Sequence, residues 1–279
     1  MSNKICMITG ANSGIGKATA LGLAKMGAHI VMVCRNEERG LTAQEDIKIQ
    51  SGNQSIDLLL ADLASQKAIR DLATEFKQNY SHLHVLINNA GIVLPKKTLT
   101  VDGIETVFAV NHLAPFLLTH LLLDVLKASA PARIITVSSR AHGGKIDFDN
   151  LQMEKGFSMF KSYAQSKLGN VLFTYELARR LEGTGVTANC LHPGGVRTRL
   201  GQHSLLFRIG YIIGAPFLKS PKKGARTSIY LASSPEVEGV TGKYFMAKKE
   251  AKSSKISHDE SVAKRLWEIS AELVKLKQG

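Results

Sequence analysis

A glycine-rich segment between an expected strand and an expected helix constrains the fold of this chain most strongly. Residues 5–9 are β-rich, a segment with Gly10, Gly14 and Gly16 follows, and helical spacing then runs over residues 14–26. Glycines let the backbone turn sharply and approach a ligand closely, and a helix start offers free N–H groups and a positive dipole end to an anion. The segment therefore predicts a dinucleotide-binding loop, and the alternative is a structural turn.

The alternation of strand and helix continues along the chain and predicts a parallel sheet covered by helices on both faces. No repeat, low-complexity tract or linker interrupts it, so we expect all 279 residues to form one α/β domain, a Rossmann-type doubly wound parallel sheet of about seven strands. The expected strands span residues 5–9, 30–34, 56–60, 85–88, 134–138, 187–192 and 243–245. The expected helices span 14–26, 37–50 capped by Asn36, 65–80 capped by Ser65, 103–128, 163–182 and 260–277.

The formal net charge of +13 raises the question of nucleic-acid binding. The Lys and Arg residues are scattered, apart from small clusters at 219–223 and 248–255, and no recognised nucleic-acid motif accompanies them. We therefore expect no nucleic-acid partner. An anionic cofactor or an anionic membrane surface explains the charge more simply.

The cysteines and the amino terminus bear on compartment and metal content. Cys6, Cys34 and Cys190 lie in expected strands, which predicts buried thiols in a reducing compartment. No His/Cys cluster has zinc-ligand spacing, so we expect no metal. Residues 1–4 lead straight into the first strand and no apolar run is long enough to span a bilayer. We expect a cytoplasmic protein without a leader or a membrane-spanning helix.

The end of the second expected strand bears on the choice between NAD and NADP. A carboxylate there would bind both ribose hydroxyls and repel a 2′-phosphate, but the chain has Cys34 followed by Arg35. The guanidinium fork matches phosphate oxygens, which favours NADP(H). The alternative is a solvated arginine at a strand end. Asp62, after the third strand, is placed either to accept from the adenine amino group or to cap the next helix.

Tyr163 and Lys167 lie four residues apart, so a helix places the phenol and the ammonium on one face. A free phenol titrates near 10, and a proton donor near pH 7 needs a shift of about three units, or about 4 kcal/mol. A cation about 4 Å away at an effective dielectric of about 20 supplies roughly that much. The pair predicts a proton-transfer device, although many surface pairs share this spacing.

Further polar groups are expected at the same edge of the sheet, where ligands bind in open α/β folds. Asn88-Asn89-Ala90-Gly91 ends the fourth strand, Ser138-Ser139 ends the fifth, and His192-Pro193-Gly194 follows the sixth. Asn111 is a polar group in the long helix that begins near residue 103.

Together these motifs resemble the short-chain dehydrogenase/reductase superfamily over residues 4 to about 245. Cys34-Arg35-Asn36, Asn111-His112-Leu113 and the stretch 166–173 are similar to its retinol dehydrogenase-like branch. The resemblance implies NADP(H) as the cofactor. It also implies hydride transfer between the nicotinamide and a lipophilic alcohol or carbonyl, such as retinal or another aldehyde or ketone.

The resemblance assigns roles to individual residues. Tyr163 resembles the general acid/base and Lys167 its pKa-lowering partner, which also binds the nicotinamide ribose. Asn111 resembles the residue that holds a water in the proton relay behind Lys167. Ser139 resembles the hydroxyl that orients the substrate oxygen, because the family usually carries it second in the pair. The long segment 140–162 leaves Ser138 as the alternative. The expected cofactor contacts are Gly10, Asn12, Ser13, Gly14, Ile15, Gly16, Arg35, Asp62, Leu63, Asn89, Ala90, Gly91, Tyr163, Lys167, Pro193, Gly194, Val196 and Thr198.

The segment over residues 195–222 is rich in Leu, Ile and Phe. In the resembled architecture this loop covers the active site, so we expect an apolar lid over a small lipophilic substrate. Two ordinary packing helices are one alternative. Peripheral contact with a membrane surface, helped by Lys219, Lys222 and Lys223, is another.

Two further expectations concern the helices. Relatives in this superfamily often pair through the two long helices, so a homodimer is one expected assembly. The closing helix at 260–277, capped by Asp259, carries an apolar stripe at Val262, Leu266, Ile269 and Leu273. This stripe is typical of a core-facing surface, and a membrane anchor is the alternative.

A cofactor-binding scaffold or redox sensor that has lost turnover is the competing hypothesis for function. Such proteins typically lose the tyrosine, the lysine or the serine. Because all three are present here, the sequence favours an enzyme.

Overall fold

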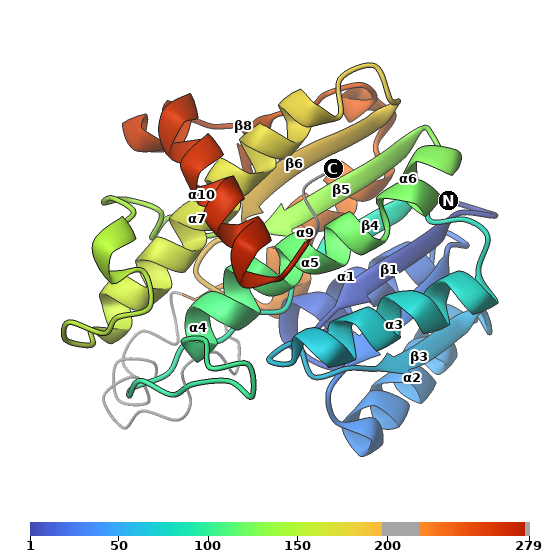
Figure 1. Ribbon diagram of the computed structural model, residues 1–279. Coiled ribbons are helices and arrows are strands. Elements are labelled where there is room, and N and C mark those ends of the chain that lie inside the picture. Colours follow the sequence, from blue (N-terminus) through green and yellow to red (C-terminus); the bar gives the residue numbers. More distant parts are fainter. Residues whose placement is uncertain (197–217, 277–279) are drawn as a thin grey trace.

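The computed structural model describes residues 1–196 and 218–276 (Figure 1). One sheet runs through it in the order β3-β2-β1-β4-β5-β6-β7-β8, and every pair is parallel except the antiparallel pair β7 and β8. This confirms the doubly wound α/β class. The short edge strand β8 was not expected. The strands are β1 Ile5–Thr9, β2 His29–Cys34, β3 Ile56–Leu60, β4 Val85–Asn88, β5 Ala132–Val137, β6 Val186–His192, β7 Lys243–Met246 and β8 Lys249–Glu250.

Helices cover both faces of the sheet because side chains alternate along each strand. In β1, Cys6 and Ile8 belong to one apolar cluster with α1 and α2, whereas Met7 belongs to a second cluster with α3, α5 and α7. All three cysteines are buried and free, as expected. The α-helices are α1 Gly14–Ala24, α2 Glu37–Ser51, α3 Gln66–Asn79, α4 Thr106–Phe108, α5 Ala114–Leu121, α6 Leu123–Ala128, α7 Met159–Arg180, α9 Pro221–Ser233 and α10 Glu260–Leu273. Short 3₁₀ segments span Phe148–Asn150, Pro235–Val237 and Lys255–His258.

The prediction of one continuous helix over residues 103–128 is wrong in its start and in its continuity. Gly103 lies in a turn with φ of 75°, and the helix begins only at Thr106, after the capping side chain of Glu105. A π-helical turn then spans Ala109–Leu113, and a break at Leu122 separates α5 from α6. Helix propensity does not reveal a π-turn, because tertiary contacts of its side chains hold it.

The helix that carries the expected catalytic pair begins earlier than expected. Helix α7 starts at Met159 and not at Tyr163, because Ser158 caps it by accepting from the backbone N–H of Lys161. The expected caps Asn36, Ser65 and Asp259 are confirmed. Helix α9 was missed. Its Ser220-Pro221 start is a common N-cap and N1 pair, and that signal could have found it.

The closing helix α10 packs across α7 and α5 (Figure 1). Leu266 is buried, and Val262, Ile269 and Leu273 pack against the same core cluster, so the core-facing interpretation of the stripe is confirmed. The Trp267 ring lies 5.0 Å from the Phe116 ring and 5.8 Å from the Phe173 ring. A homodimer through the long helices stays a prediction.

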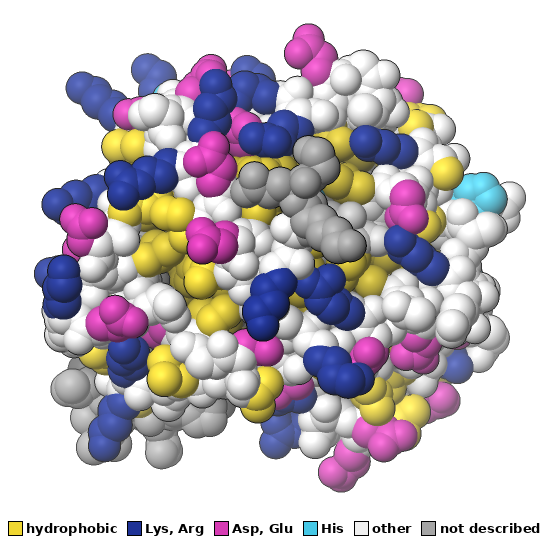
Figure 2. Space-filling view, viewed as in Figure 1, with side chains coloured by type: hydrophobic (Ala, Val, Ile, Leu, Met, Phe, Trp, Pro, Cys, Tyr) yellow, Lys and Arg dark blue, Asp and Glu magenta, His cyan; other side chains and the backbone are white. Residues whose placement is uncertain are grey.

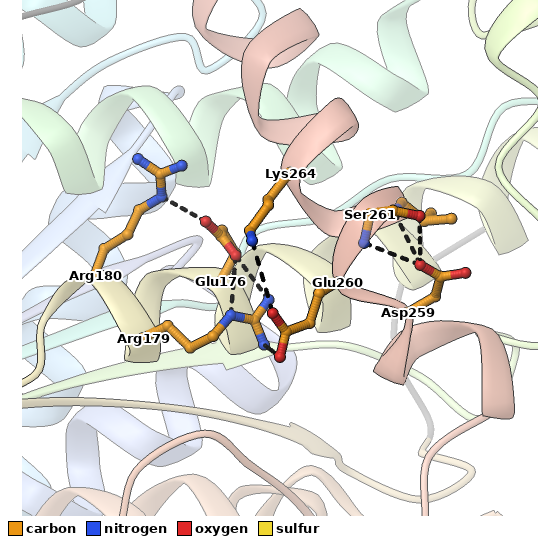
Figure 3. Close-up of polar contacts among 8 residues, drawn as sticks. Glu176, Arg179, Arg180, Asp259, Glu260, Ser261 and Lys264 are labelled. Carbon is orange, nitrogen blue, oxygen red and sulfur yellow. Dashed lines mark hydrogen bonds and ion pairs between the residues drawn. The ribbon is translucent and has the colours of Figure 1, made fainter.

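An ion-pair network fastens α10 to the end of α7 (Figure 3). Glu176, whose side chain is 3% exposed, accepts from Arg179 at 2.7 Å and from Arg180 at 2.7 Å. Arg179 also reaches Glu260 of α10 at 3.9 Å, and the Arg180 guanidinium lies 4.3 Å from the Trp267 ring centroid. A buried carboxylate thus holds two arginines that contact α10.

The exposed charges on the same face are dispersed (Figure 2). Lys and Arg side chains alternate with Asp and Glu over this view, so the described residues on this face form no continuous basic track of the kind that a nucleic-acid backbone follows. Within residues 1–196 and 218–276, no helix has the length and apolar character that crossing a bilayer requires. The same residues bring no three potential His, Cys, Asp or Glu ligands together at a metal-binding distance.

We predict that Glu176→Gln lowers the free energy of unfolding by about 1–2 kcal/mol in urea titrations, because the three charge-assisted hydrogen bonds from Arg179 and Arg180 are weakened. Burial alone would raise the pKa of the Glu176 carboxyl, but the hydrogen bonds from Arg179 and Arg180 outweigh it and leave the pKa below its ordinary value. The stabilisation is therefore complete above the unfolded-state pKa of about 4.3 and is lost as the pH falls through the lower folded-state value.

The difference between wild type and Glu176→Gln should accordingly narrow below about pH 4. Lys264→Gln is the matched control. Its contact with Glu260 is exposed and 3.8 Å long, so its loss should change stability by less than about 0.5 kcal/mol. Equal stability of wild type and Glu176→Gln at neutral pH would contradict this account.

Candidate active site

The glycine-rich segment forms a tight loop between β1 and α1. Gly10 and Gly14 have positive φ of 66° and 55°. A Cβ on Gly16 would lie 2.2 Å from the Gly10 carbonyl oxygen, so only glycine fits there. Ser13 begins α1 without a side-chain cap, which leaves the first N–H groups of the helix open to a ligand. This geometry is a cradle for a pyrophosphate.

Thr9 and Asn89 lock this loop to the end of β4. The Thr9 hydroxyl accepts from the backbone N–H groups of Asn89 and Ala90, each at 3.0 Å. The Asn89 side-chain amide donates to the Thr9 carbonyl at 2.8 Å. Asn89 therefore supports the loop from beneath. Sequence reasoning missed Thr9 as a site residue, although its place at the strand end just before the loop was the available signal.

Arg35 and Asp62 lie together at the adenosine end of the expected cofactor site. The Arg35 side chain is 75% exposed, and its Nη1 lies 3.9 Å from Asp62 Oδ2. The other carboxylate oxygen of Asp62 accepts from the backbone N–H of Ala64 at 3.0 Å. Because Ser65 caps α3, the alternative that Asp62 caps this helix is wrong. Neighbouring Leu63 packs partly against the core.

The two serines at the end of β5 have different environments. Ser138 is 2% exposed, and its hydroxyl donates to the Lys167 carbonyl oxygen at 2.8 Å, which ties β5 to α7. The Ser139 hydroxyl accepts from the backbone N–H of Ala141 at 3.2 Å, and it lies close enough to Tyr163 to lower the pKa of the phenol. Ser138 thus has a structural partner, whereas Ser139 faces the phenol.

Tyr163 and Lys167 lie on one face of α7, as expected. The Lys167 Nζ lies 5.7 Å from the centroid of the Tyr163 ring and donates to the Val137 carbonyl oxygen at 3.0 Å. Burial lowers the pKa of Lys167 to about 8. Burial raises the pKa of the Tyr163 phenol, and the hydrogen bond with Ser139 opposes this rise. Within the described residues, Ser139 is thus the group that lowers the pKa of the phenol. The expected lowering of this pKa by Lys167 stays a prediction.

Asn111 is buried in the π-turn and joins three elements. Its Oδ1 accepts from the Ile92 N–H at 2.7 Å, and its Nδ2 donates to the Ile92 carbonyl and to the Ser166 hydroxyl, each at 3.0 Å. A Cβ on Gly91 would lie 3.3 Å from both Asn111 Oδ1 and Lys167 Nζ. Both polar groups therefore lie close to Gly91, and a side chain at this position would crowd them.

His112, which follows Asn111, links this turn to the closing helix. Its Nε2 shares a hydrogen bond with the Ser270 hydroxyl at 2.9 Å, and burial lowers the pKa of the imidazole to about 4. The ring is therefore neutral at physiological pH. It connects the π-turn to α10 and is no proton donor for a substrate.

The turn after β6 carries the last group of expected cofactor contacts. Pro193 and Gly194 follow the strand, and Val196 bridges to Lys219 in a parallel pair. A Cβ on Gly224 of α9 would meet Val196 at 2.7 Å and Ile15 at 3.2 Å, so this turn packs near the start of α1. Thr198 and most of the expected lid at 195–222 lie outside the described residues. The structure brings the other expected residues to one edge of the sheet, except that Leu63 is partly packed in the core.

Comparison with known proteins agrees with this arrangement. The sequence profile of the short chain dehydrogenase family matches residues 4–206, and the chain belongs to that family. Within it, the chain is similar to the retinol dehydrogenases. It is 47% identical to human retinol dehydrogenase 14, over 99% of this chain and 88% of the relative. It is 44% identical to human retinol dehydrogenase 11, over 99% of this chain and 87% of the relative. The resemblance to the retinol dehydrogenase-like branch is thus confirmed.

Solved structures show the same fold. An uncharacterized protein from Mycobacterium Paratuberculosis superposes with a TM-score of 0.80 at 32% identity, over 98% of this chain and 94% of the other. The RhlG/NADP active-site complex of Pseudomonas aeruginosa gives a TM-score of 0.72 at 25% identity, over 88% of this chain and 94% of the other. The chain is therefore an oxidoreductase of the short-chain type.

Proposed function

We propose that this protein is an NADP(H)-dependent oxidoreductase that reduces a lipophilic aldehyde or ketone, retinal among the candidates, or oxidises the corresponding alcohol. The observation that carries the proposal is the contact of Tyr163 with Ser139 beside the buried ammonium of Lys167. This group of side chains lies at the sheet edge that also carries the glycine-rich loop. Its relatives of known name are retinol dehydrogenases, which supports an apolar carbonyl substrate.

The residues present fit a nicotinamide dinucleotide. The glycine loop is too tight for a Cβ on Gly16 and leaves the first N–H groups of α1 without a side-chain cap, and Arg35 provides a cation at the adenosine end. When bound, the cofactor supplies or accepts the hydride. Gly10, Ser13 and the first turn of α1 would hold its pyrophosphate. Lys167 would bind the nicotinamide ribose, and the turn at Pro193 and Gly194 would contact the nicotinamide.

The chain's own residues would handle the proton. The Ser139 hydroxyl holds the carbonyl oxygen of the substrate, and the Tyr163 phenol donates its proton to that oxygen as negative charge develops there. Lys167, with a pKa of about 8, stays mostly protonated at pH 7 and stabilises the phenolate that remains. In this mechanism Asn111 would hold a water that returns a proton to Tyr163 and Lys167.

We predict that Tyr163→Phe lowers kcat for NADPH-dependent aldehyde reduction by about 10²-fold or more, because the proton donor is removed. The rate is followed by the loss of NADPH absorbance with a panel of aldehydes that includes retinal. The affinity for NADPH should stay within about threefold of wild type, since the phenyl ring remains.

Tyr175→Phe is the matched control on the same helix. Its hydroxyl bonds with Ser253 at 2.8 Å, away from the site, so activity should stay within about twofold of wild type. Equal reduction rates in wild type and Tyr163→Phe would refute the proposed mechanism.

Cofactor preference rests on Arg35. We predict that Arg35→Ala weakens NADPH binding about tenfold, because a guanidinium contact with the 2′-phosphate is lost, and leaves NADH binding unchanged. Fluorescence titration of each dinucleotide measures both affinities. Arg39→Ala, which removes a nearby arginine on α2, should change neither affinity. A similar loss for NADPH and NADH in Arg35→Ala would contradict recognition of the 2′-phosphate.

A further inference from the structure

Lys219 lies beside the turn that follows β6, at the sheet edge that carries the proposed cofactor site. No sequence motif predicted this position. Its backbone N–H donates to the Gly195 carbonyl at 2.7 Å, and it pairs with Val196 in the parallel bridge. These contacts fix its Cα beside the turn that follows β6. The sequence suggested only a membrane-facing role for this lysine.

The side chain of Lys219 lies along the bare face of Gly194. A Cβ on Gly194 would lie 3.1 Å from Lys219 Cδ and 3.2 Å from Nζ. Gly194 also has a positive φ of 92°, which disfavours any other residue there. The absence of a side chain at position 194 thus makes room for the ammonium directly over the turn expected to contact the cofactor.

This turn is close to the glycine-rich loop. Val196 and Ile15 both pack at the position of Gly224, so the segment that carries Lys219 forms the wall next to the start of α1. A dinucleotide bound between the glycine loop and the Pro193–Gly194 turn would lie against this wall. Arg35 follows β2, on the far side of β1 from β6, and belongs to the adenosine end.

The charges around Lys219 favour an anion. Among residues 1–196 and 218–276, no carboxylate forms an ion pair with its ammonium. The charges of Lys219 and Arg140 both act on His192. His192 is neutral, because burial and then the charges of Arg140 and Lys219 lower its pKa to about 4. A lysine without a carboxylate partner at this edge of the sheet suits an anionic ligand such as a diphosphate.

We propose that Lys219 binds the pyrophosphate of the dinucleotide and is, with the glycine loop, a determinant of cofactor affinity. This inference rests on the proposed function, since it requires a bound dinucleotide. It assigns Lys219 and Arg35 to different phosphates of the same ligand. The two residues should therefore respond differently to ligands that carry only one of these phosphates.

The experiment compares full-length wild type, Lys219→Gln, Lys219→Arg, Lys222→Gln and Arg35→Ala. NADPH affinity is measured by fluorescence titration, and adenosine 2′-phosphate, which has no pyrophosphate, is measured as a competitor. Lys219→Gln should weaken NADPH binding about tenfold at low salt and leave the affinity for adenosine 2′-phosphate unchanged. Arg35→Ala should weaken both. The effect of Lys219→Gln should shrink as salt screens the contact.

Lys222→Gln removes the same charge three residues away on the exposed first turn of α9 and should leave both affinities within about twofold of wild type. Lys219→Arg should restore most of the NADPH affinity. If wild type and Lys219→Gln bind NADPH equally well, the proposed role of Lys219 is refuted. It is also refuted if Lys219→Gln weakens adenosine 2′-phosphate binding as much as NADPH binding. Neither result contradicts the proposed function. If wild type binds no dinucleotide, the proposed function falls with it.

Discussion

The buried ammonium of Lys167 is the element on which the rest of the site depends. Its side chain is 4% exposed, and within the described residues it has no carboxylate partner, only the Val137 carbonyl and the face of the Tyr163 ring. Removing a charge from water in this way is costly, and the lowered pKa of Lys167 expresses that cost. The surrounding fold must hold the ammonium in place, and in the proposed mechanism a cation kept in this position stabilises a phenolate one helical turn away.

The holding elements come from distant parts of the chain. Ser138 fastens β5 to the Lys167 carbonyl, and Asn111 fastens the π-turn to α7 through Ser166. His112 and Ser270 join that same π-turn to α10, which in turn packs on α7 through Trp267 and the Glu176 network. The closing helix thus braces both elements that carry the proton-handling groups, although it contributes none of them.

The sequence was sufficient for those features that local pattern determines. The glycine loop, the alternation of strands and helices, and the caps at Asn36, Ser65 and Asp259 all follow from short-range chemistry. Features held by tertiary contacts were missed: the π-turn around Asn111, the supporting hydroxyl of Thr9, and the different partners of Ser138 and Ser139. The sequence-based argument that a nearby cation lowers the pKa of Tyr163 also left out burial, which raises the pKa of this phenol. Lys219 was visible only as one of several scattered basic residues, since its proximity to Gly194 depends on the fold.

Direct hydride transfer is the claim on which this account of the protein stands or falls. Its most direct measurement is mass spectrometry of the alcohol formed from an aldehyde and NADPH that carries deuterium at both C4 positions of the nicotinamide. We expect one deuterium on the carbinol carbon of each product molecule. With Tyr163→Phe, labelled alcohol should form at least about 10²-fold more slowly. An alcohol that forms without deuterium at that carbon, or no alcohol from retinal or any other lipophilic aldehyde, would contradict it.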